Sequence, residues 1–583
     1  MINIKENERL NKLNHSCAHL LAQAVKHLYP NAKFWVGPVI EEGFYYDIDL
    51  GDNVITEEDI PKIEKEMKKI AKDGKRIVRH EISKEEALDM FKDDSYKLDL
   101  INRMDEDNVI SCYSQGDFTD LCRGGHVEST KELKHFKLLK ISGAYWKGDS
   151  NNKMLQRIYG IAFDTDEELE AHLKELEEAK ERDHRKIGKD LKIFMIDELV
   201  GKGLPLYLPN GFILWNNLET YIRNKEIKRG YKHVLTPPLG NVNLYKVSGH
   251  LDHYKDSMFP IMQVDDEEFV LRPMNCPHHM MIFGSELRSY KDLPIRIAEI
   301  ARDCRYETSG SLKGIERART FCQNDSHIFC TLEQVKDEFK AVVDLILECY
   351  KELNITNYRF ELSLRDPENK VKYFQDDEMW DKAENMLRDV MKDIGIDYVE
   401  KKDEAAFYGP KLDVQVKPAV GNEITISTCQ IDFCLPMKFD LKYVDADGSK
   451  KTPVVLHRAV FGSIDRFIAY YLEETKGNLP IWLSPVQAII LPVNNKYHLE
   501  YSKKIEQKLL ENEIRVELDD REEKLGYRLR ETQTRKIPLT LILGQNEVDN
   551  NTISYRLHGS EETNTKTIDE FISYLKKEIS DKK

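Results

Sequence analysis

The segment RIAEIARDCRYETSGSLKGIERARTFCQNDSHIF, from Arg296 to Phe329, is the most informative stretch of the chain. Two runs with apolar residues enclose the turn-rich sequence SGSLKG, a pattern that predicts a strand–loop–strand hairpin. Successive side chains of a strand alternate between its faces, so several polar residues can share one face; they are Arg305, Glu307, Arg317, Arg319, Gln323 and Asp325. Guanidinium groups beside a carboxylate suit a triphosphate and a carboxylate-bearing substrate, because the planar fork binds oxyanions in a bidentate way. Taken alone, the segment is equally well explained as an edge hairpin with a solvated charged face.

Three further segments accompany this hairpin in a recognisable order. They are FVLRPMNCPHHMMIF (Phe269–Phe283), FYGPKLDVQV (Phe407–Val416) and LHRAVFGSIDRFIAYYLEE (Leu456–Glu474). The hairpin resembles motif 2 of the class II aminoacyl-tRNA synthetases, and the last segment resembles motif 3. Together the four segments resemble the threonyl-tRNA synthetase family, from about Asn14 to the C-terminus. The resemblance favours the substrate-site interpretation of the hairpin.

Composition predicts a soluble protein of several domains. The 583 residues suffice for about three or four domains of typical size. No apolar run approaches the roughly 20 residues that span a bilayer, and the N-terminal sequence has no apolar signal core. Ten scattered cysteines without paired spacing indicate reduced thiols. We therefore expect a cytoplasmic protein with no membrane partner.

The formal charge of −16 argues against nonspecific nucleic-acid binding. Phosphate contact depends on local potential, however, so shape-directed binding of tRNA stays open. Basic clusters occur at Arg182–Lys192, Arg223–His233 and Tyr527–Lys536. Each of them is also explained as the solvated face of a helix.

Periodicity divides the chain into four parts. Residues 1–166 open with the helical sequence NHSCAHLLAQAVKHLYP and continue with short strands and a charged helix, which is typical of an α+β module. Residues 167–190 lie in a segment whose acidic residues precede its basic ones, and we expect one exposed connecting helix over 164–191. Residues 191–480 mix long helices with antiparallel-looking strands. Residues 481–583 alternate buried strands with helices, which predicts a small, mostly parallel α/β domain.

The resemblance gives each part a role. It implies an α+β multidomain protein with an N-terminal α+β editing domain, a linker helix, a class II catalytic domain built on an antiparallel sheet with helices, and a C-terminal α/β anticodon-binding domain. The helix ILWNNLETYIRNKEIKRGY and the expected strand HVLTPPL resemble motif 1, with Pro238 at the position that packs in the family's homodimer interface. Many relatives carry an additional small N-terminal β-grasp domain, and we expect this chain to be a form without it.

The resemblance implies a ligase that activates L-threonine with ATP and Mg2+ and transfers it to the 3′ end of tRNA(Thr). Positioning and charge stabilisation dominate such chemistry. Arg305 is expected to bridge the substrate carboxylate and the α-phosphate, and Glu307 to read the adenine amino group. Arg317 and Arg466 are expected to hold the γ-phosphate. Each arginine alone is also explained as a surface ion-pair partner.

Selecting threonine over valine requires more than shape, because an apolar pocket rejects an isostere only about 100-fold. A Lewis acid that coordinates both the amine and the hydroxyl solves this problem, and such zinc sites have three protein ligands and an open position. The resemblance implies one Zn2+ per subunit on Cys276, His327 and His457. Each alone is also explained as a buried cysteine or a hydrogen-bonded histidine. The implied amino-acid pocket further contains Gln323, Asp325, Tyr408, Lys411 and Gln430.

Some positions depart from the family pattern. His278 stands where glycine is common and adds a potential ligand beside Cys276. Asp465 replaces the glutamate that usually precedes Arg466, and Thr425 replaces a pocket glutamine. None of these changes removes an expected metal ligand or phosphate-binding arginine.

A second, hydrolytic site is expected on physical grounds. Serine lacks only the methyl group of threonine, which is worth roughly 1–3 kcal/mol in a pocket. His15 and His19 lie one helical turn apart, on one face. The sequence CRGGH adds Cys122 and His126 after Asp120, and the set resembles the editing site shared by threonyl- and alanyl-tRNA synthetases, with Lys97 as a further member. We favour water-based hydrolysis of seryl-tRNA(Thr), while two histidines with Cys-x-x-x-His also suit a metal.

In the last part, Arg530, Glu547 and Arg556 match family residues that contact anticodon bases, and Glu522 replaces an asparagine at another contact. Splayed bases of single-stranded loops hydrogen-bond to such side chains. Each is also explained as an ordinary surface charge. Two alternatives to the ligase remain: a binder of tRNA-shaped RNA with little or no charging activity, and a class II synthetase for another amino acid, such as the prolyl or seryl enzymes.

Overall fold

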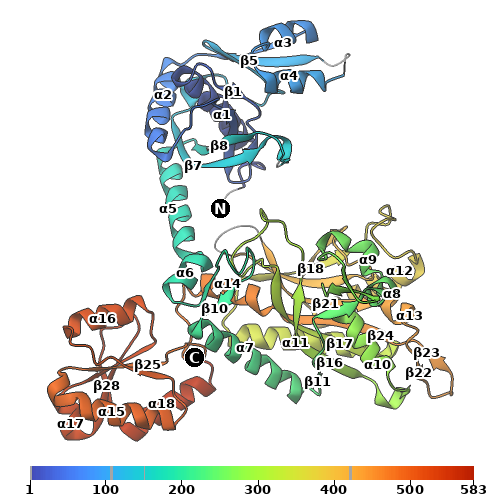
Figure 1. The fold of residues 1–583 in the computed structure, drawn as a ribbon, viewed down its shortest axis with the longest axis vertical. Coiled ribbons are helices and arrows are strands. Elements are labelled where there is room, and N and C mark those ends of the chain that lie inside the picture. Colours follow the sequence, from blue (N-terminus) through green and yellow to red (C-terminus); the bar gives the residue numbers. More distant parts are fainter. Residues whose placement is uncertain (1–2, 106–108, 150, 419–422) are drawn as a thin grey trace. The chain divides into compact units, whose positions relative to one another are not determined.

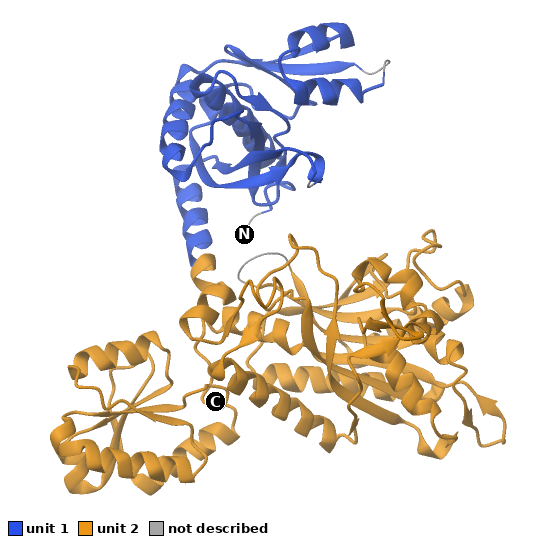
Figure 2. Ribbon diagram, viewed as in Figure 1, with its two compact units in different colours: residues 1–178 blue, residues 179–583 orange. Residues whose placement is uncertain are grey.

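The computed structural model describes residues 3–105, 109–149, 151–418 and 423–583 (Figure 1). The chain forms two compact units, Met1–Glu178 and Ala179–Lys583 (Figure 2). Among the described residues, no helix has both the length and the apolar character needed to span a membrane.

The first unit is built around helix α1 (Glu8–Leu28), which begins where the Asn7 side chain accepts a hydrogen bond from the Leu10 N–H. Its buried face packs against a sheet with strand order β1-β3-β8-β7, to which β2 is added at β3. The predicted N-terminal helix is confirmed and starts one and a half turns earlier than the periodicity indicated. The other elements are β1 (Lys33–Phe34), β2 (Val39–Ile40), β3 (Gly43–Asp49), α2 (Ile60–Asp73), β7 (His135–Tyr145) and β8 (Met154–Phe163).

A second, three-stranded sheet completes this unit. Its order is β4-β5-β6, and all pairings are antiparallel. Helix α4 presents Lys97 from its first turn after the Asp94 side chain caps it. The elements are β4 (Ile77–Ile82), α3 (Lys84–Met90), α4 (Ser95–Asn102), β5 (Ile110–Gln115) and β6 (Phe118–Leu121).

The predicted single connecting helix is wrong, because the segment forms two helices, α5 (Asp166–Arg182) and α6 (His184–Asp190). Asp183 has extended backbone angles and its side chain accepts the Arg185 N–H, so it ends one helix and caps the next. Helix α6 is also not fully exposed, since His184 and Ile187 are buried.

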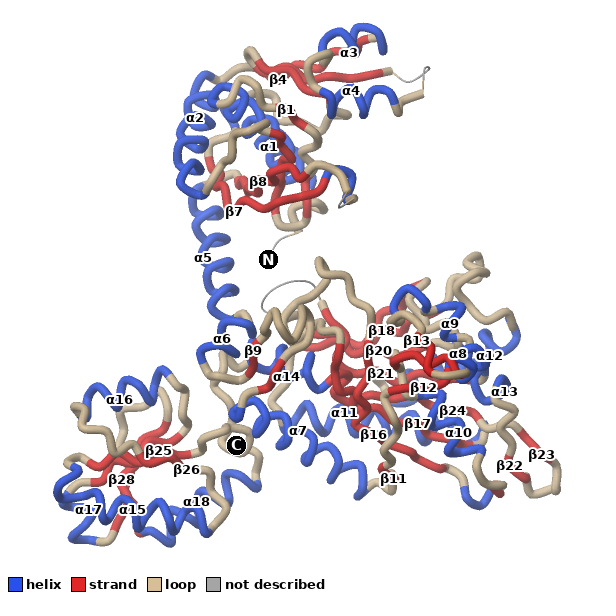
Figure 3. The backbone as a smooth tube through the Cα atoms, in the orientation of Figure 1, coloured by secondary structure: helices blue, strands red, loops and turns tan. Residues whose placement is uncertain are grey.

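The second unit contains an eight-stranded sheet with the order β11-β16-β17-β24-β21-β20-β18-β19 (Figure 3). The predicted hairpin is confirmed: β16 (Ile295–Cys304) and β17 (Thr320–Cys330) pair antiparallel throughout, with Ile297 opposite His327. Only the β11–β16 and β18–β19 pairs are parallel in this sheet. Helices α7, α11 and α14 bury their apolar residues in the same core as the sheet. Further elements are α7 (Pro209–Lys228), α11 (Val335–Glu352), β18 (Tyr358–Leu364), α12 (Asp377–Ile394), β19 (Tyr398–Lys402), β20 (Lys411–Val416), β21 (Ile424–Asp432), β24 (Val454–Ser463) and α14 (Ile464–Glu474).

The expected strand HVLTPPL is largely wrong. Strand β11 covers only Lys232–His233, because Pro237 and Pro238 follow and proline cannot donate to a ladder. The chain then returns through β12 (Leu239–Asn241), which pairs with β14 (Glu267–Leu271). Smaller elements are β9 (Phe194–Met195), β10 (Leu206–Tyr207), α8 (Val242–Ser248), α9 (His250–His253), β13 (Met262–Val264), α10 (Cys276–Gly284), β15 (Arg288–Ser289), α13 (Cys434–Lys438), β22 (Tyr443–Val444) and β23 (Lys450–Lys451).

The C-terminal part of this unit has its own five-stranded sheet, in the order β26-β25-β27-β28-β29, and its own apolar core. The expectation of a mostly parallel sheet is wrong for half of the pairings: β25 is parallel to β26 and β27, whereas β28 is antiparallel to both of its neighbours. The elements are β25 (Ala488–Pro492), α15 (Asn495–Glu511), β26 (Val516–Leu518), α16 (Leu525–Thr534), β27 (Leu539–Leu543), α17 (Gln545–Asn550), β28 (Thr552–Leu557), β29 (Asn564–Thr567) and α18 (Ile568–Ser580).

Candidate functional site

A cavity of about 540 Å³ opens over strands β17, β21 and β24 of the second unit. Gln323, Asp325 and His327 alternate along β17 and therefore face the same side. His457 on β24 is the register partner of His327. Cys276, the first residue of α10, also lines the cavity. The sheet and helix α10 thus bring together residues that are up to 181 positions apart in the chain (457 minus 276).

The three predicted zinc ligands converge. One ligating atom from each of Cys276, His327 and His457 lies within 4.8 Å of the others, and all three side chains are buried. The Nε2 atom of His327 has no hydrogen-bond partner although it is buried. A thiol, two imidazoles and an unsatisfied ring nitrogen beside an open cavity form a donor set that fits a zinc ion with three protein ligands.

Both histidines are held by residues that sequence reasoning missed. The Nε2 atom of His457 lies 2.8 Å from an Asp432 carboxylate oxygen, and the Nδ1 atom of His327 lies 2.8 Å from Nδ1 of His279. Asp432 is itself fixed, because its other oxygen accepts the N–H of Cys434 at 2.7 Å. The expectation that His278 adds a ligand is not supported: it lies outside the ligand group, with its ring 6.4 Å from that of Tyr245.

The remaining predicted pocket residues line the same cavity. The Tyr408 hydroxyl donates to Gln430 at 2.7 Å, and its ring stacks on that of His457 at 4.8 Å. Lys411 pairs with the buried Asp413 and leaves its aliphatic stem along the wall. The wall is therefore polar where the imidazoles lie and aromatic beside them.

A smaller cavity of about 130 Å³ adjoins the first, since Arg305 and Gln323 line both. It also receives Glu307, Arg317 and Arg466. Burial lowers the pKa of Arg466, and the charge of Arg305 lowers it further. The pocket is lined by three arginines and two glutamates, so it carries excess positive charge. Such a pocket suits a polyanionic ligand.

The charged residues of the hairpin have distinct contacts. Arg317 forms an ion pair with Glu307 at 2.8 Å, and Arg466 donates to the Glu316 carbonyl at 3.1 Å. Arg319 does not line either cavity and instead donates to the carbonyls of Glu307 and Lys202.

Two of the family departures have clear positions. Asp465 is buried and accepts hydrogen bonds from the Tyr207 hydroxyl and the Cys322 N–H, so it anchors the start of α14. Thr425 lines the smaller cavity and accepts from Gln415 at 2.9 Å.

In the first unit, a cavity of about 730 Å³ is lined by all members of the second predicted set except His126: His15, His19, Lys97, Asp120 and Cys122. Ligating atoms of His15, His19, Cys122 and His126 all lie within 4.8 Å of one another. The Cys122 sulfur lies 3.3 Å from Nε2 of His15 and 3.1 Å from Nε2 of His126. Helix α1 supplies the first two residues, and the loop after β6 supplies the others.

The protonation of this group follows from its burial. Burial lowers the pKa of His15 and of His19, and it lowers the pKa of His126 to about 2. Burial likewise raises the pKa of the Cys122 thiol to about 11. The imidazoles are therefore neutral at neutral pH and offer lone pairs to hydrogen-bond donors, while the thiol keeps its proton.

Lys97 and Asp120 form a buried ion pair in the wall of this cavity. The Lys97 ammonium also donates to the Tyr46 hydroxyl and to the Trp35 carbonyl, each at 3.1 Å. The Tyr46 hydroxyl in turn donates to Asp120. Sequence reasoning missed Tyr46, which stands on β3 in an alternating strand with no local signal of its role.

The predicted anticodon-reading residues lie on three different elements of the C-terminal part: Arg530 on α16, Glu547 on α17 and Arg556 on β28. Glu547 caps its own helix by accepting the Gly544 N–H at 2.8 Å and also binds the Ser554 hydroxyl at 2.7 Å. Arg556 donates to Thr563 at 2.8 Å. Glu522 is exposed in the loop before α16.

Three protein families match the chain in order. They are the "Threonyl and Alanyl tRNA synthetase second additional domain" over residues 110–159, the "tRNA synthetase class II core domain (G, H, P, S and T)" over residues 254–475, and the "Anticodon binding domain" over residues 487–578.

The chain is also similar to individual curated and solved proteins. A threonine–tRNA ligase of Geobacillus sp. (strain WCH70) is 55% identical over 574 residues, which cover 98% of this chain and 89% of the relative. The corresponding ligase of Oceanobacillus iheyensis is 54% identical over 585 residues, covering 100% of this chain and 90% of the relative. A crystal structure described as the RNA binding domain of threonyl-tRNA synthetase from Cryptosporidium parvum Iowa II superposes with a TM-score of 0.64 at 36% identity and covers 68% of this chain and 98% of that one.

Proposed function

Because the chain belongs to the threonine–tRNA ligase family of class II aminoacyl-tRNA synthetases, we propose that it joins L-threonine to the 3′ end of tRNA(Thr) at the expense of ATP and hydrolyses mischarged seryl-tRNA(Thr) at a separate site. The observation that carries the synthetic part is the convergence of Cys276, His327 and His457 in a cavity that shares Arg305 with the arginine-lined pocket.

Activation takes place where the two cavities meet. Arg305 lies on their common wall and can hold the threonine carboxylate and the α-phosphate together, which converts a two-substrate encounter into an in-line attack within one complex. Arg317 and Arg466 neutralise the phosphate tail together with Mg2+, and Glu307 accepts from the adenine amino group. Stabilisation of charge in a preorganised pocket is the main contribution that the protein makes to such a reaction.

Cys276, His327 and His457 would hold one Zn2+ per subunit. When bound, the ion supplies a Lewis acid for the amine and the hydroxyl of threonine, and valine lacks the second of these donors. Asp325 and Gln323 face the same space from β17 and orient the amine. Tyr408, Lys411 and Gln430 close the pocket around the side chain and carboxylate.

Threonine-dependent ATP–pyrophosphate exchange tests this assignment. The exchange should be lost in Cys276→Ala, and zinc analysis should fall from one ion per protomer to none. Cys330→Ala is the matched control, because Cys330 is also a buried cysteine of this unit but lies outside the ligand group, with its thiol hydrogen-bonded to the Val454 carbonyl. A Cys276→Ala protein that keeps both its zinc and its exchange rate would refute the proposed ligand set.

For editing, the neutral imidazoles of His15, His19 and His126 position a water through their lone pairs, and the Lys97–Asp120 pair lines the same cavity. Changing His15 and His19 to alanine should leave threonylation intact while seryl-tRNA(Thr) accumulates; unchanged deacylation would remove the assignment. The four ligating groups also suit a metal. Elemental analysis distinguishes a metal-free from a zinc-dependent editing site, because two zinc ions per protomer would contradict the metal-free mechanism.

We further propose that the protein is a cytoplasmic homodimer. Leu235, between β11 and the two prolines, is 90% exposed, and Leu199 is 99% exposed. Leu235 lies three residues before Pro238, which resembles the residue that packs in the family's homodimer interface. All ten cysteines are free thiols, in accord with a reducing compartment.

In the C-terminal part, Arg530 and Arg556 are proposed to contact anticodon bases. Glu547 is proposed to do so as well, and its capping bond to the Gly544 N–H holds it in place.

A further inference from the structure

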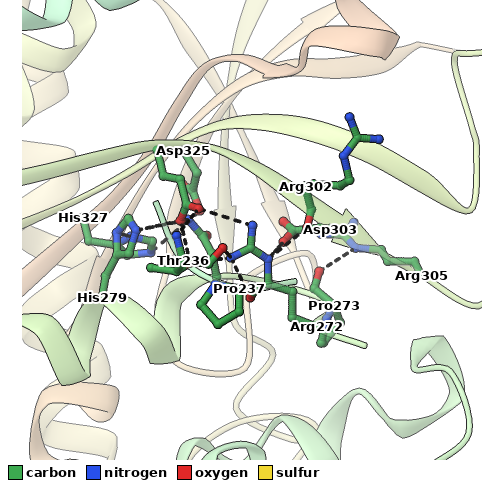
Figure 4. Close-up of polar contacts among 12 residues, drawn as sticks. Thr236, Pro237, Arg272, Pro273, His279, Arg302, Asp303, Arg305, Asp325 and His327 are labelled. Carbon is green, nitrogen blue, oxygen red and sulfur yellow. Dashed lines mark hydrogen bonds and ion pairs between the residues drawn. The ribbon is translucent and has the colours of Figure 1, made fainter. Parts of the chain in front are cut away.

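A chain of buried polar groups runs behind the proposed zinc ligands. The Nδ1 atoms of His327 and His279, both labelled in Figure 4, lie 2.8 Å apart. Nε2 of His279 lies 3.2 Å from a carboxylate oxygen of Glu299. None of the three residues is more than 1% exposed. Water therefore does not satisfy these atoms, and each ring nitrogen depends on its protein partner.

Glu299 is surrounded by hydrogen-bond donors. Its two oxygens accept the N–H and the hydroxyl of Thr236, each at 2.9 Å, and they also face Arg272 at 3.4 Å and Asn275 at 3.3 Å. Burial opposes ionisation, yet the bonds from His279 and Thr236 and the charge of Arg272 lower the pKa of Glu299 to about 2. The carboxylate is consequently ionised and can only accept hydrogen bonds. Thr236, Arg272 and Asn275 hold it in position.

This acceptor determines where the protons of the two rings lie. A carboxylate that can only accept requires the hydrogen of His279 to be on Nε2, which leaves a lone pair on Nδ1. That lone pair accepts a hydrogen from Nδ1 of His327, so Nε2 of His327 carries the free lone pair. Nε2 is also the His327 atom that is buried without a hydrogen-bond partner, and His327 belongs to the ligand group with Cys276 and His457.

We propose that Glu299 and His279 are positioning residues that set the tautomer and the ring orientation of His327 for zinc, through two successive hydrogen bonds. The proposal rests on the proposed zinc site and adds residues that no ligand motif contains. Carboxylates that orient a ligating histidine change metal affinity by about 10–100-fold when they are removed. Here the carboxylate acts through an intervening imidazole, and the same Glu299 is bonded to the segment after β11.

Zinc affinity measured by competition with a chromophoric chelator, in the absence of substrates, tests the proposal. His279→Leu should weaken zinc binding by about 10–100-fold, because the Nδ1 hydrogen of His327 loses its acceptor. His279→Asn should bind within a few-fold of the unaltered protein, because its amide oxygen lies where Nδ1 lay and can still accept. Glu299→Gln should weaken zinc binding by an intermediate factor, since an amide fixes the His279 proton less strongly than a carboxylate.

Asp303→Asn is the matched control. Asp303 is equally buried and pairs with Arg272, but it does not contact either histidine. It should lower thermal stability as the other variants do and leave zinc affinity unchanged. If His279→Leu does not fold, the zinc affinities of Glu299→Gln and Asp303→Asn are compared instead. The proposal expects weaker binding in Glu299→Gln only.

The outcomes separate this inference from the function on which it rests. An unaltered protein that binds no zinc sinks the proposed site itself. An unaltered protein that binds zinc, with His279→Leu and Glu299→Gln binding it equally tightly, overturns the relay alone. Equal weakening in His279→Leu, His279→Asn and Asp303→Asn also overturns it, because the effect would then follow core stability and not the acceptor on His327.

Discussion

Replacing Lys97 with methionine is the sharpest perturbation of the first unit. The side chains of Lys97 and Asp120 are 4% and 2% exposed and form an ion pair in the wall of the proposed editing cavity. The substitution keeps an unbranched apolar side chain as far as Cε but removes the ammonium. It leaves the Asp120 carboxylate with the Tyr46 hydroxyl and the Leu121 N–H. Removing one partner of a buried ion pair costs about 3–5 kcal/mol.

Hydrogen exchange of backbone amides measures this loss of stability separately in each unit. Amides of α1 and β3, which form the core of the first unit, should lose about two to three and a half orders of magnitude of protection, since about 1.4 kcal/mol corresponds to a factor of ten. Protection in the second unit should stay unchanged. Asp120→Asn should produce a comparable loss, because it leaves the Lys97 ammonium buried without its carboxylate.

The double variant Lys97→Met/Asp120→Asn removes both charges and should be more stable than either single variant, within roughly 1–2 kcal/mol of the unaltered protein. Deacylation of seryl-tRNA(Thr) should nevertheless be lost in all three variants, while threonylation continues. If the losses of the two single variants simply add in the double variant, the two groups are not coupled and the reasoning from their buried contact fails.

Four further results are expected. Cys122 should react slowly with iodoacetamide at pH 7, because burial raises its thiol pKa to about 11; the rate should rise about tenfold per pH unit up to pH 10, and a plateau below pH 9 would contradict the neutral thiol. Arg305→Lys should lower kcat/KM for pyrophosphate exchange by about 10²–10³-fold, because lysine cannot form the fork that bridges two anions, whereas Arg302→Lys on the exposed side of β16 should have no such effect. Leu235→Glu should shift the protein from dimer to monomer in light scattering, and a dimer of unchanged stability would place the interface elsewhere. Gly211→Ala should lower thermal stability by about 1–3 kcal/mol, because the added Cβ would lie 2.0 Å from the Ile193 carbonyl oxygen, and an unchanged melting curve would show that this backbone can yield.

Local patterns were sufficient for the elements whose signal is periodic. The hairpin of β16 and β17 follows from alternation around a glycine-containing turn, and α1 follows from its apolar face. The break at Asp183 was missed because a capping aspartate inside a charged run looks like one more exposed charge. The early end of β11 is signalled by Pro237 and Pro238, which should have limited the expected strand.

The site shows a similar division. Family motifs named Cys276, His327 and His457, but the groups that hold them come from other strands and have no sequence spacing of their own. His278 counted only as a potential ligand beside Cys276, and residues two positions apart on a helix do not share a face. His279, three positions after Cys276, does share it, and helix geometry alone could have indicated it. No sequence spacing predicts the contacts of Asp432, Glu299 and Tyr46. Each of these residues meets its partner only because strands pair or because a helix packs on a sheet.

Leu235 and Thr236 are neighbours in the chain with opposite environments, one at the solvent and one bonded to the carboxylate behind the zinc ligands. A single peptide bond therefore separates the proposed dimer surface from the residues that support the proposed zinc site. If association of two copies tightens threonine binding through this link, thermodynamic reciprocity requires threonine to tighten the association by the same factor. Substrate titrations performed at several protein concentrations would then yield affinities that change with dilution.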